Sequence, residues 1–186
     1  MADLHLLALL SGVRKGAVAY PSLEWLIPHE VKVRLLFSGG KAEKFNGLVK
    51  DFKEFWELLT EAPKVVDESL EEFLEQVERD DRLSFGKGVA EKPGELQFLP
   101  QKVLAYEREN CLFGGTEADS ALILIGVDTE RAELYLETVY EVVSSVAELF
   151  NCRNLAFGVV DVPGQKEFFK VYALLKREFK GGRDAT

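Results

Sequence analysis

Two aspartates, Asp128 and Asp161, come closest to a chemical site in type and placement. Each follows an apolar run, residues 121–127 and 155–160, and each precedes a segment with helical spacing. If the two runs are parallel strands, both carboxylates lie at the end of the sheet where open α/β sheets place ligands. There they could hold a divalent metal such as Mg²⁺ or share a proton. Aspartate is equally a preferred helix N-cap, and we favour that role because such caps are common.

A second candidate is the tetrad Ser38, Gly39, Gly40 and Lys41, which follows a predicted strand over residues 31–37. It resembles the start of the SGGxDS loop of PP-loop ATP pyrophosphatases, whose backbone amides hold the pyrophosphate of ATP. The resemblance implies a phosphate site, but Ala42 and Glu43 depart from the family motif at the next two positions. A glycine pair after a strand is also typical of a hairpin turn. We favour the turn and predict that the tetrad does not hold ATP.

Other catalytic signatures are incomplete in this sequence. The DVPGQ segment that begins at Asp161 resembles a switch segment of translation-factor GTPases, but the sequence lacks the GxxxxGK[ST] loop that would cradle the phosphates. His5 and His29 are too few for a His-rich metal site, and Cys111 and Cys152 are too far apart for a CxxC knuckle. We therefore name no catalytic residue and expect no cofactor.

Two amphipathic segments predict a helical hairpin over residues 48–79. The first has an apolar residue at every third or fourth position between Leu48 and Leu59, and Pro63 limits it. Asp67 is a plausible N-cap for the second, whose apolar stripe comprises Leu70, Phe73, Leu74 and Val77. Because both segments are amphipathic, we expect the two helices to bury their stripes against each other.

The C-terminal half predicts strands alternating with helices. Residues 121–127 and 155–160 should be parallel strands joined by a helix over 129–150 in a right-handed crossover, and residues 168–179 have the spacing of a final helix. Shorter strands are expected at 96–99 and 102–108, after a glycine-containing loop over 83–94. The predicted fold is α+β, a mixed β-sheet with helices mainly on one face, in a single domain over residues 1–186. It includes a C-terminal βαβ-α unit and the acidic helical hairpin.

Composition narrows the classes of partner. The 186 residues carry a formal net charge of −9, which disfavours nucleic acid, because binding to phosphates depends on Lys and Arg. An apolar run of the roughly 18 residues needed to span a bilayer is missing, so we expect no membrane partner and a cytoplasmic location. A single Met beside abundant Glu, Lys and Arg is typical of proteins from hot environments.

Charge is concentrated in the predicted hairpin, where residues 51–82 hold twelve acidic and four basic side chains. Such a surface steers basic partners, so Glu71, Glu75 and Glu78 are candidate partner-binding residues. The leading hypothesis is a non-enzymatic interaction or assembly protein that docks a protein partner, or a second copy in a homodimer, through this acidic helical surface.

Two other classes of function remain open. One is a nucleotide- or metal-dependent enzyme that uses Asp128, Asp161 and the Ser38–Lys41 loop. The other is a regulatory domain that binds a small molecule in an apolar pocket lined by aromatic side chains such as Trp25, Tyr106 and Phe113.

Overall fold

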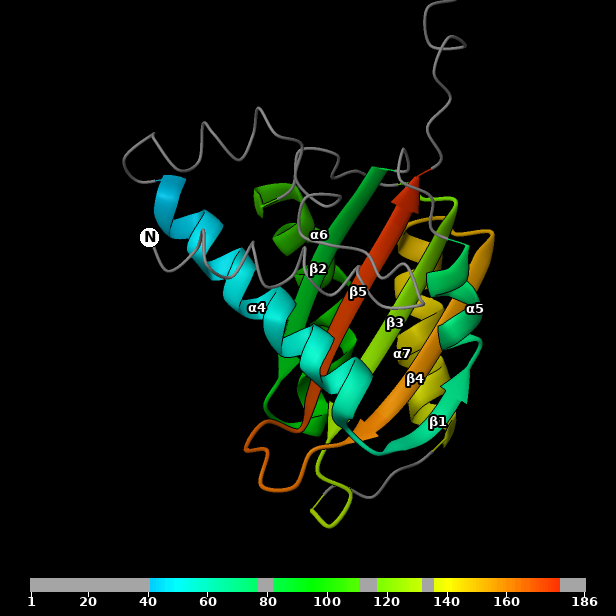
Figure 1. Cartoon of the computed structure of the whole chain (residues 1–186). Helices are drawn as coiled ribbons and strands as arrows, with labels where there is room; N and C mark the ends of the chain where they lie inside the picture. Colours follow the sequence, from blue (N-terminus) through cyan, green and yellow to red (C-terminus); the bar gives the residue numbers. More distant parts are fainter. Residues whose placement is uncertain (1–40, 77–81, 111–116, 132–135, 178–186) are drawn as a thin grey trace, which may run out of the picture.

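The computed structural model describes residues 41–76, 82–110, 117–131 and 136–177 (Figure 1). Its helices are α4 (Lys41–Glu61), α5 (Leu70–Glu75), the 3₁₀ helix η2 (Pro93–Phe98), α6 (Leu99–Asn110) and α7 (Leu136–Leu149). Its strands are β1 (Lys64–Glu68), β2 (Arg82–Ala90), β3 (Ser120–Val127), β4 (Asn154–Asp161) and β5 (Phe169–Arg177). The predicted strand over residues 31–37 lies outside the described residues.

The strands form one mixed sheet in the order β1-β4-β3-β5-β2. β3 and β4 are parallel and joined through α7, while the other neighbouring pairs are antiparallel. The predicted α+β class, its mixed sheet and its βαβ unit are therefore confirmed. At one edge, β1 is a five-residue strand with mostly exposed side chains, and its pairing with β4 is irregular between Lys64 and Val66.

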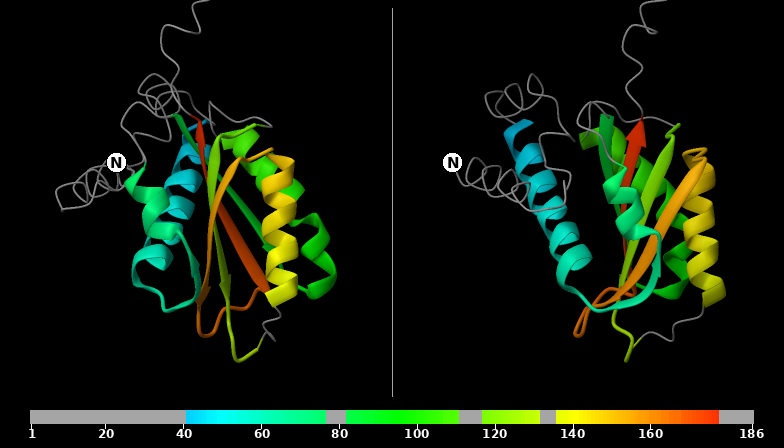
Figure 2. Two further views of the ribbon diagram at one scale, coloured as in Figure 1. Left: turned by 90° about the vertical axis from the view of Figure 1, so that its right-hand side faces the viewer. Right: turned by 45° about the vertical axis from the view of Figure 1, so that its right-hand side comes forward.

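Helices cover both faces of the sheet, so the prediction that they lie mainly on one face was wrong. In Figure 2, α4 and α5 lie on one side of the sheet, and α6 and α7 lie on the other. Leu122 and Leu124 of β3 pack into the core beneath α4 and α5, while Ile123 and Ile125 pack into the core beneath α6 and α7. Because both faces of β3 carry apolar side chains, each face requires a covering layer.

α4 was predicted correctly, but the helical hairpin was not. Leu48, Phe52 and Phe55 of its stripe are almost fully buried. β1 then intervenes before α5, so each helix packs on the sheet instead of forming a hairpin with the other. α5 buries Leu70, Phe73 and Leu74 of the predicted stripe, and Val77 lies outside the described residues.

The segment predicted as the final helix of a βαβ-α unit is instead strand β5. It lies between β3 and β2, and its residues Val171 to Lys176 are all buried. A strand that is apolar on both faces has apolar side chains at three- and four-residue spacings by default, so periodicity alone cannot separate it from a helix.

The reverse error affects residues 83–108. The predicted loop over 83–94 contains β2, and the strands predicted at 96–99 and 102–108 are η2 and α6. Two glycines in β2 suggested a loop, but they allow α6 to approach. A Cβ atom built on Gly86 would lie only 2.7 Å from both Cγ1 and the carbonyl oxygen of Val103.

Candidate functional site

Asp128 and Asp161 lie side by side, as the sequence predicted, because Asp128 directly follows β3 and Asp161 is the last residue of the parallel strand β4. Asp161 is the register partner of Val127. The Asp161 carboxylate accepts hydrogen bonds from the backbone amide of Thr129 (3.1 Å) and from its hydroxyl (2.9 Å). The Asp128 carboxylate accepts from the amides of Glu130 and Gly164, both at 3.1 Å.

These contacts make the two aspartates links between two turns. Asp128 and Thr129 belong to the turn after β3, and Gly164 belongs to the turn between β4 and β5. Neither aspartate directly precedes a helix in the described residues, since α7 begins at Leu136 and Asp161 leads towards β5. Across the described ranges, no group of three or more His, Cys, Asp or Glu side chains is placed to hold a metal ion.

Gln165 also belongs to the junction, by which we mean the two turns that Asp128 and Asp161 link. Sequence reasoning did not identify Gln165 as a site residue. Its side chain is buried, and its amide nitrogen donates to the carbonyl oxygens of Gly126 (2.7 Å) and Glu167 (3.1 Å). Arg131 donates to the Gln165 carbonyl oxygen at 2.8 Å. Among the described residues, the Gln165 side-chain oxygen has no hydrogen-bond partner, and a Cβ atom on Gly126 would come within 3.1 Å of it. The available signal was the position of Gln165 in the DVPGQ segment.

A polar network fixes α4 to the sheet. Glu54 of α4 accepts hydrogen bonds from the hydroxyl of Tyr172 and from the ammonium group of Lys170, the latter at 2.9 Å. Lys87 of β2 lies 3.0 Å from the carboxylate of Asp51 and 3.4 Å from that of Glu54. Asp51 also accepts from the Tyr106 hydroxyl at 2.7 Å. The network therefore joins four elements: α4, β2, β5 and α6.

The network shifts the titration of its members. Burial opposes the charged form of Glu54, but the hydrogen bonds from Tyr172 and Lys170 and the charges of Lys87 and Lys170 outweigh burial and lower its pKa. Burial, reinforced by the neighbouring Glu54 carboxylate, raises the pKa of Tyr172 above its usual value. Tyr172 therefore stays neutral at physiological pH and donates its hydrogen bond to an ionised Glu54.

A second buried polar cluster lies between β2, β5 and α6. Arg177 donates to the Ser84 hydroxyl at 2.7 Å and to the Glu107 carboxylate at 3.2 and 3.3 Å, and Ser84 donates to the same carboxylate. Glu107 is fully buried, so Arg177 supplies the positive charge that a buried carboxylate requires. Burial, aided by the negative charges of Glu107 and Asp119, also raises the pKa of the nearby Cys152 thiol to about 11.

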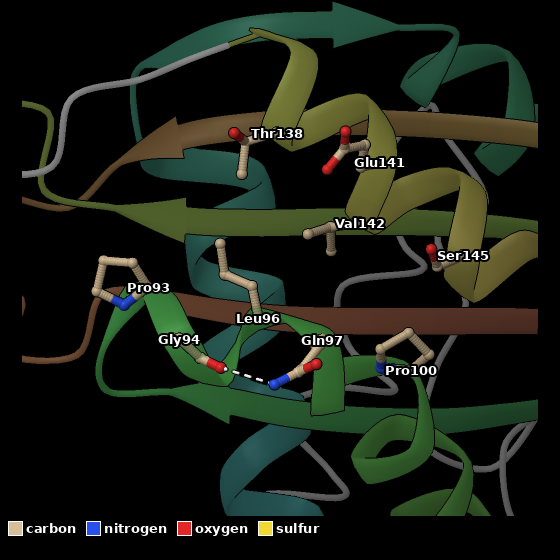
Figure 3. Close-up of a pocket in the computed structure, with 9 residues that line it drawn as sticks. All are labelled: Pro93, Gly94, Leu96, Gln97, Pro100, Thr138, Glu141, Val142 and Ser145. Carbon is tan, nitrogen blue, oxygen red and sulfur yellow. Dashed lines mark hydrogen bonds between the residues drawn. The ribbon is translucent and has the colours of Figure 1, made fainter.

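An open groove of about 610 Å³ separates α7 from η2 and the start of α6 (Figure 3). Pro93, Leu96 and Pro100 line one wall, and Thr138, Glu141 and Val142 line the other. Two large apolar side chains on the same elements, Phe98 of η2 and Leu136 of α7, are each 53% exposed.

Most of the remaining predicted site residues lie outside the described residues. Ser38, Gly39 and Gly40 lie outside the described residues, and Lys41 is the first residue of α4. Because a helix follows the glycine pair, the expected hairpin turn was wrong, while the phosphate interpretation stays untested. Trp25 and Phe113 lie outside the described residues, and Tyr106 belongs to the network of α4.

The acidic surface is smaller than the sequence suggested. Asp51 and Glu54 of α4 pair with lysines of the sheet, so they do not belong to a free acidic rim. Glu71 and Glu75 are exposed on α5, and Glu78 lies outside the described residues.

The sequence matches no protein-family model and no curated protein, but the structure resembles solved structures. An FtsZ dimer from M. jannaschii matches with a TM-score of 0.52 and 15% sequence identity, over 78% of this chain and 42% of the FtsZ chain. CetZ from Methanosaeta thermophila matches with a TM-score of 0.52 and 17% identity, over 87% of this chain and 43% of that chain. A subunit of the TubZ-Bt four-stranded filament matches with a TM-score of 0.56 and 11% identity, over 96% of this chain and 41% of that chain.

These comparisons define the class of fold. The described chain has the fold of a part of FtsZ, CetZ and TubZ, and it spans less than half the length of each. This finding overturns the hypothesis of a non-enzymatic protein that docks partners through an acidic helical surface. The structural reason is that β1 splits the expected hairpin and that lysines of the sheet neutralise the acidic face of α4. No helix in the described ranges is long and apolar enough to cross a membrane.

Proposed function

We propose that this protein is a self-assembling module of a filament system of the FtsZ and TubZ type, in which copies associate in response to guanine nucleotide. The observation that carries the proposal is the match of 96% of the chain to one subunit of the TubZ-Bt filament. Two further matches, each with a TM-score of 0.52, are protofilaments of Bacillus thuringiensis TubZ in GTPγS and GDP forms. A third is an FtsZ dimer.

The surface of the module is suited to self-association on the layer formed by η2, α6 and α7. Phe98 and Leu136 are exposed there, and Tyr140 of α7 is 47% exposed. Exposed aromatic and aliphatic side chains beside an open groove are typical of protein interfaces, whose energetic centres are rich in aromatic residues. We therefore place the contact between copies on this layer.

The only support for a role of guanine nucleotide comes from the similar structures, which include TubZ in GTPγS and GDP forms. Three of the four carboxylate oxygens of Asp128 and Asp161 already accept hydrogen bonds from the turns, so we do not assign the nucleotide to this junction. The small cavity beside Asp128, Arg131 and Gln165 measures about 70 Å³, the volume of about two water molecules at roughly 30 Å³ each, so it does not admit a nucleotide.

Sedimentation and right-angle light scattering of the purified protein with GTP, GTPγS, GDP or no nucleotide test the proposal. We expect assembly that rises with protein concentration above a threshold and that differs between GTPγS and GDP. A protein that stays monomeric by light-scattering mass in all four conditions would refute self-assembly. Assembly that is identical in all four would refute the nucleotide response alone.

A further inference from the structure

A separate polar cavity of about 190 Å³ lies between α5 and the first residues of β3 and β4. Ser69, Glu72 and Gln76 line it from the α5 side, and Ser120 and Asn154 line it from the sheet. Phe73 and Ala156 supply apolar wall. The cavity is distinct from the junction at Asp128 and Asp161, because it adjoins the opposite ends of the two parallel strands.

Ser120 gives this cavity its chemical interest. The residue is only 7% exposed, and its hydroxyl oxygen is buried without a hydrogen-bond partner in the part of the chain that the structure describes. Buried polar groups nearly always have partners, because a hydroxyl that leaves water must recover its hydrogen bonds in the fold. A buried hydroxyl of this kind on the wall of a cavity therefore offers a hydrogen-bonding position that a bound molecule can complete.

Ser120 is the centre of a polar row at this end of the sheet. Its register partners are Asn154 in β4 and Lys176 in β5, and partners in register point to the same face. Lys176 is 8% exposed, and its ammonium group donates to the carbonyl oxygen of Gln76 at 3.3 Å. The next row on this face, Ala156, Leu122 and Leu174, is part of the apolar core. Ser120 and Asn154 of this row line the cavity, and Lys176 lies beside Ser120 in β5.

The side of the cavity formed by α5 carries the opposite charge. Glu72 is exposed, and a carboxylate there can accept from an ammonium group. The Ser120 hydroxyl and the Asn154 amide can donate to an anionic group, Glu72 offers a carboxylate across the cavity, and Phe73 and Ala156 form an apolar wall. Together these groups match one small molecule. That molecule carries a carboxylate, an ammonium group and a short apolar side chain.

We propose that this cavity binds a free aliphatic α-amino acid, with its carboxylate on Ser120 near Lys176 and its ammonium group on Glu72. The cavity volume of about 190 Å³ equals about six water molecules at roughly 30 Å³ each, so it admits an amino acid but not a nucleotide. The site is independent of the proposed assembly, because it lies on the α5 face of the sheet.

Isothermal titration calorimetry of the full chain with L-leucine and L-valine tests the proposal. Leucinamide lacks the carboxylate and N-acetyl-leucine lacks the ammonium group, so both should bind at least about tenfold more weakly, as expected when one charge-assisted hydrogen bond is lost. Equal binding of the parent amino acid and either analogue would contradict the zwitterionic pose. Absence of any amino-acid binding would mean that only water fills the cavity and would refute the site.

Three variants connect the binding to the cavity. Ser120→Ala and Glu72→Gln should each weaken leucine binding about tenfold or more, while Glu71→Gln, an exposed change on the same helix, should leave it unchanged. Ser120→Ala removes only a buried hydroxyl that has no partner among the described residues, so the melting temperature of the variant should not fall below that of wild type. A loss of binding then cannot be ascribed to misfolding. Wild-type affinity in Ser120→Ala would refute the proposal.

Discussion

Glu54 of α4 and Tyr172 of β5 are 118 residues apart in the sequence and share a hydrogen bond in the fold. Lys170, two residues before Tyr172, pairs with the same carboxylate oxygen. One side chain therefore attaches the longest described helix to a central strand, and the effect of removing it can be measured directly.

Glu54→Gln should lower the free energy of unfolding by about 1–3 kcal/mol, because the variant loses charge-assisted bonds from Lys170 and Tyr172. The matched control is Glu57→Gln on the same helix, whose ion pair with Lys53 is exposed and should contribute less than about 0.5 kcal/mol. Urea unfolding at pH 7 measures both. Equal stability of the two variants would show that the Glu54 network is not stabilising.

The same carboxylate predicts a pH dependence. The pKa of Glu54 is lower in the folded protein than in the unfolded chain. Its contribution is therefore complete above the unfolded pKa and is lost as pH falls through the folded pKa. The stability difference between wild type and Glu54→Gln should shrink on acidification below about pH 4. A difference that stays constant from pH 7 to about pH 3 would contradict the assignment.

Gly86→Ala should destabilise the protein by about 1–3 kcal/mol, because the new methyl group would meet Val103 of α6 at 2.7 Å, including its backbone oxygen. Gly94→Ala is the control, since a Cβ atom there has no neighbour within 4 Å. Thermal unfolding followed by circular dichroism compares the two. A Gly86→Ala protein as stable as wild type would mean that α6 does not pack this closely on β2.

Asp128→Ala should reduce stability by about 0.5–2 kcal/mol, the range for losing a carboxylate that satisfies backbone amides. The two amides at stake belong to Glu130 and Gly164. Chemical denaturation measures the loss, and titration of Mg²⁺ into wild type and variant tests the alternative role. Unchanged stability together with lost Mg²⁺ binding would reassign Asp128 to a metal site.

Replacing both Phe98 and Leu136 by Glu should raise the concentration needed for assembly by about tenfold or more, because large apolar side chains dominate interface energetics. Glu137→Gln, an exposed change adjacent to Leu136, serves as the control. Sedimentation at several protein concentrations supplies the measurement. If the double variant assembles like wild type, the contact between copies lies on another face.

The spacing of apolar residues correctly predicted those elements that pack against elements close to them in the sequence. The crossover of β3, α7 and β4 and the stripe of α4 were recognisable because each has a clear period and a turn at its end. β5 was predicted as a helix and α6 as a strand. For β5 the reason is that burial on both faces gives a strand the apolar spacing of a helix. Glycines in β2 suggested a loop until the packing of α6 explained them.

The candidate site divides in the same way. The meeting of Asp128 and Asp161 followed from two parallel strands, whereas the junction with Gln165 depended on the path of the turn after β4. Lys87 and Glu54 are 33 residues apart, and their pairing depends on which strand lies beneath α4. The sequence pattern does not show which strand lies beneath α4, because strand order is set by tertiary packing.

The short edge strand β1 has a consequence for how copies of this protein can meet. An exposed edge offers unpaired backbone groups on which a second sheet can add, and charged side chains with an irregular strand oppose that addition. β1 provides both features, through exposed Lys64, Asp67 and Glu68 and through the irregular pairing near Val66. Strand addition of the amyloid kind is disfavoured at this edge. In the assembly that we propose, copies would therefore meet through surfaces other than the β1 edge.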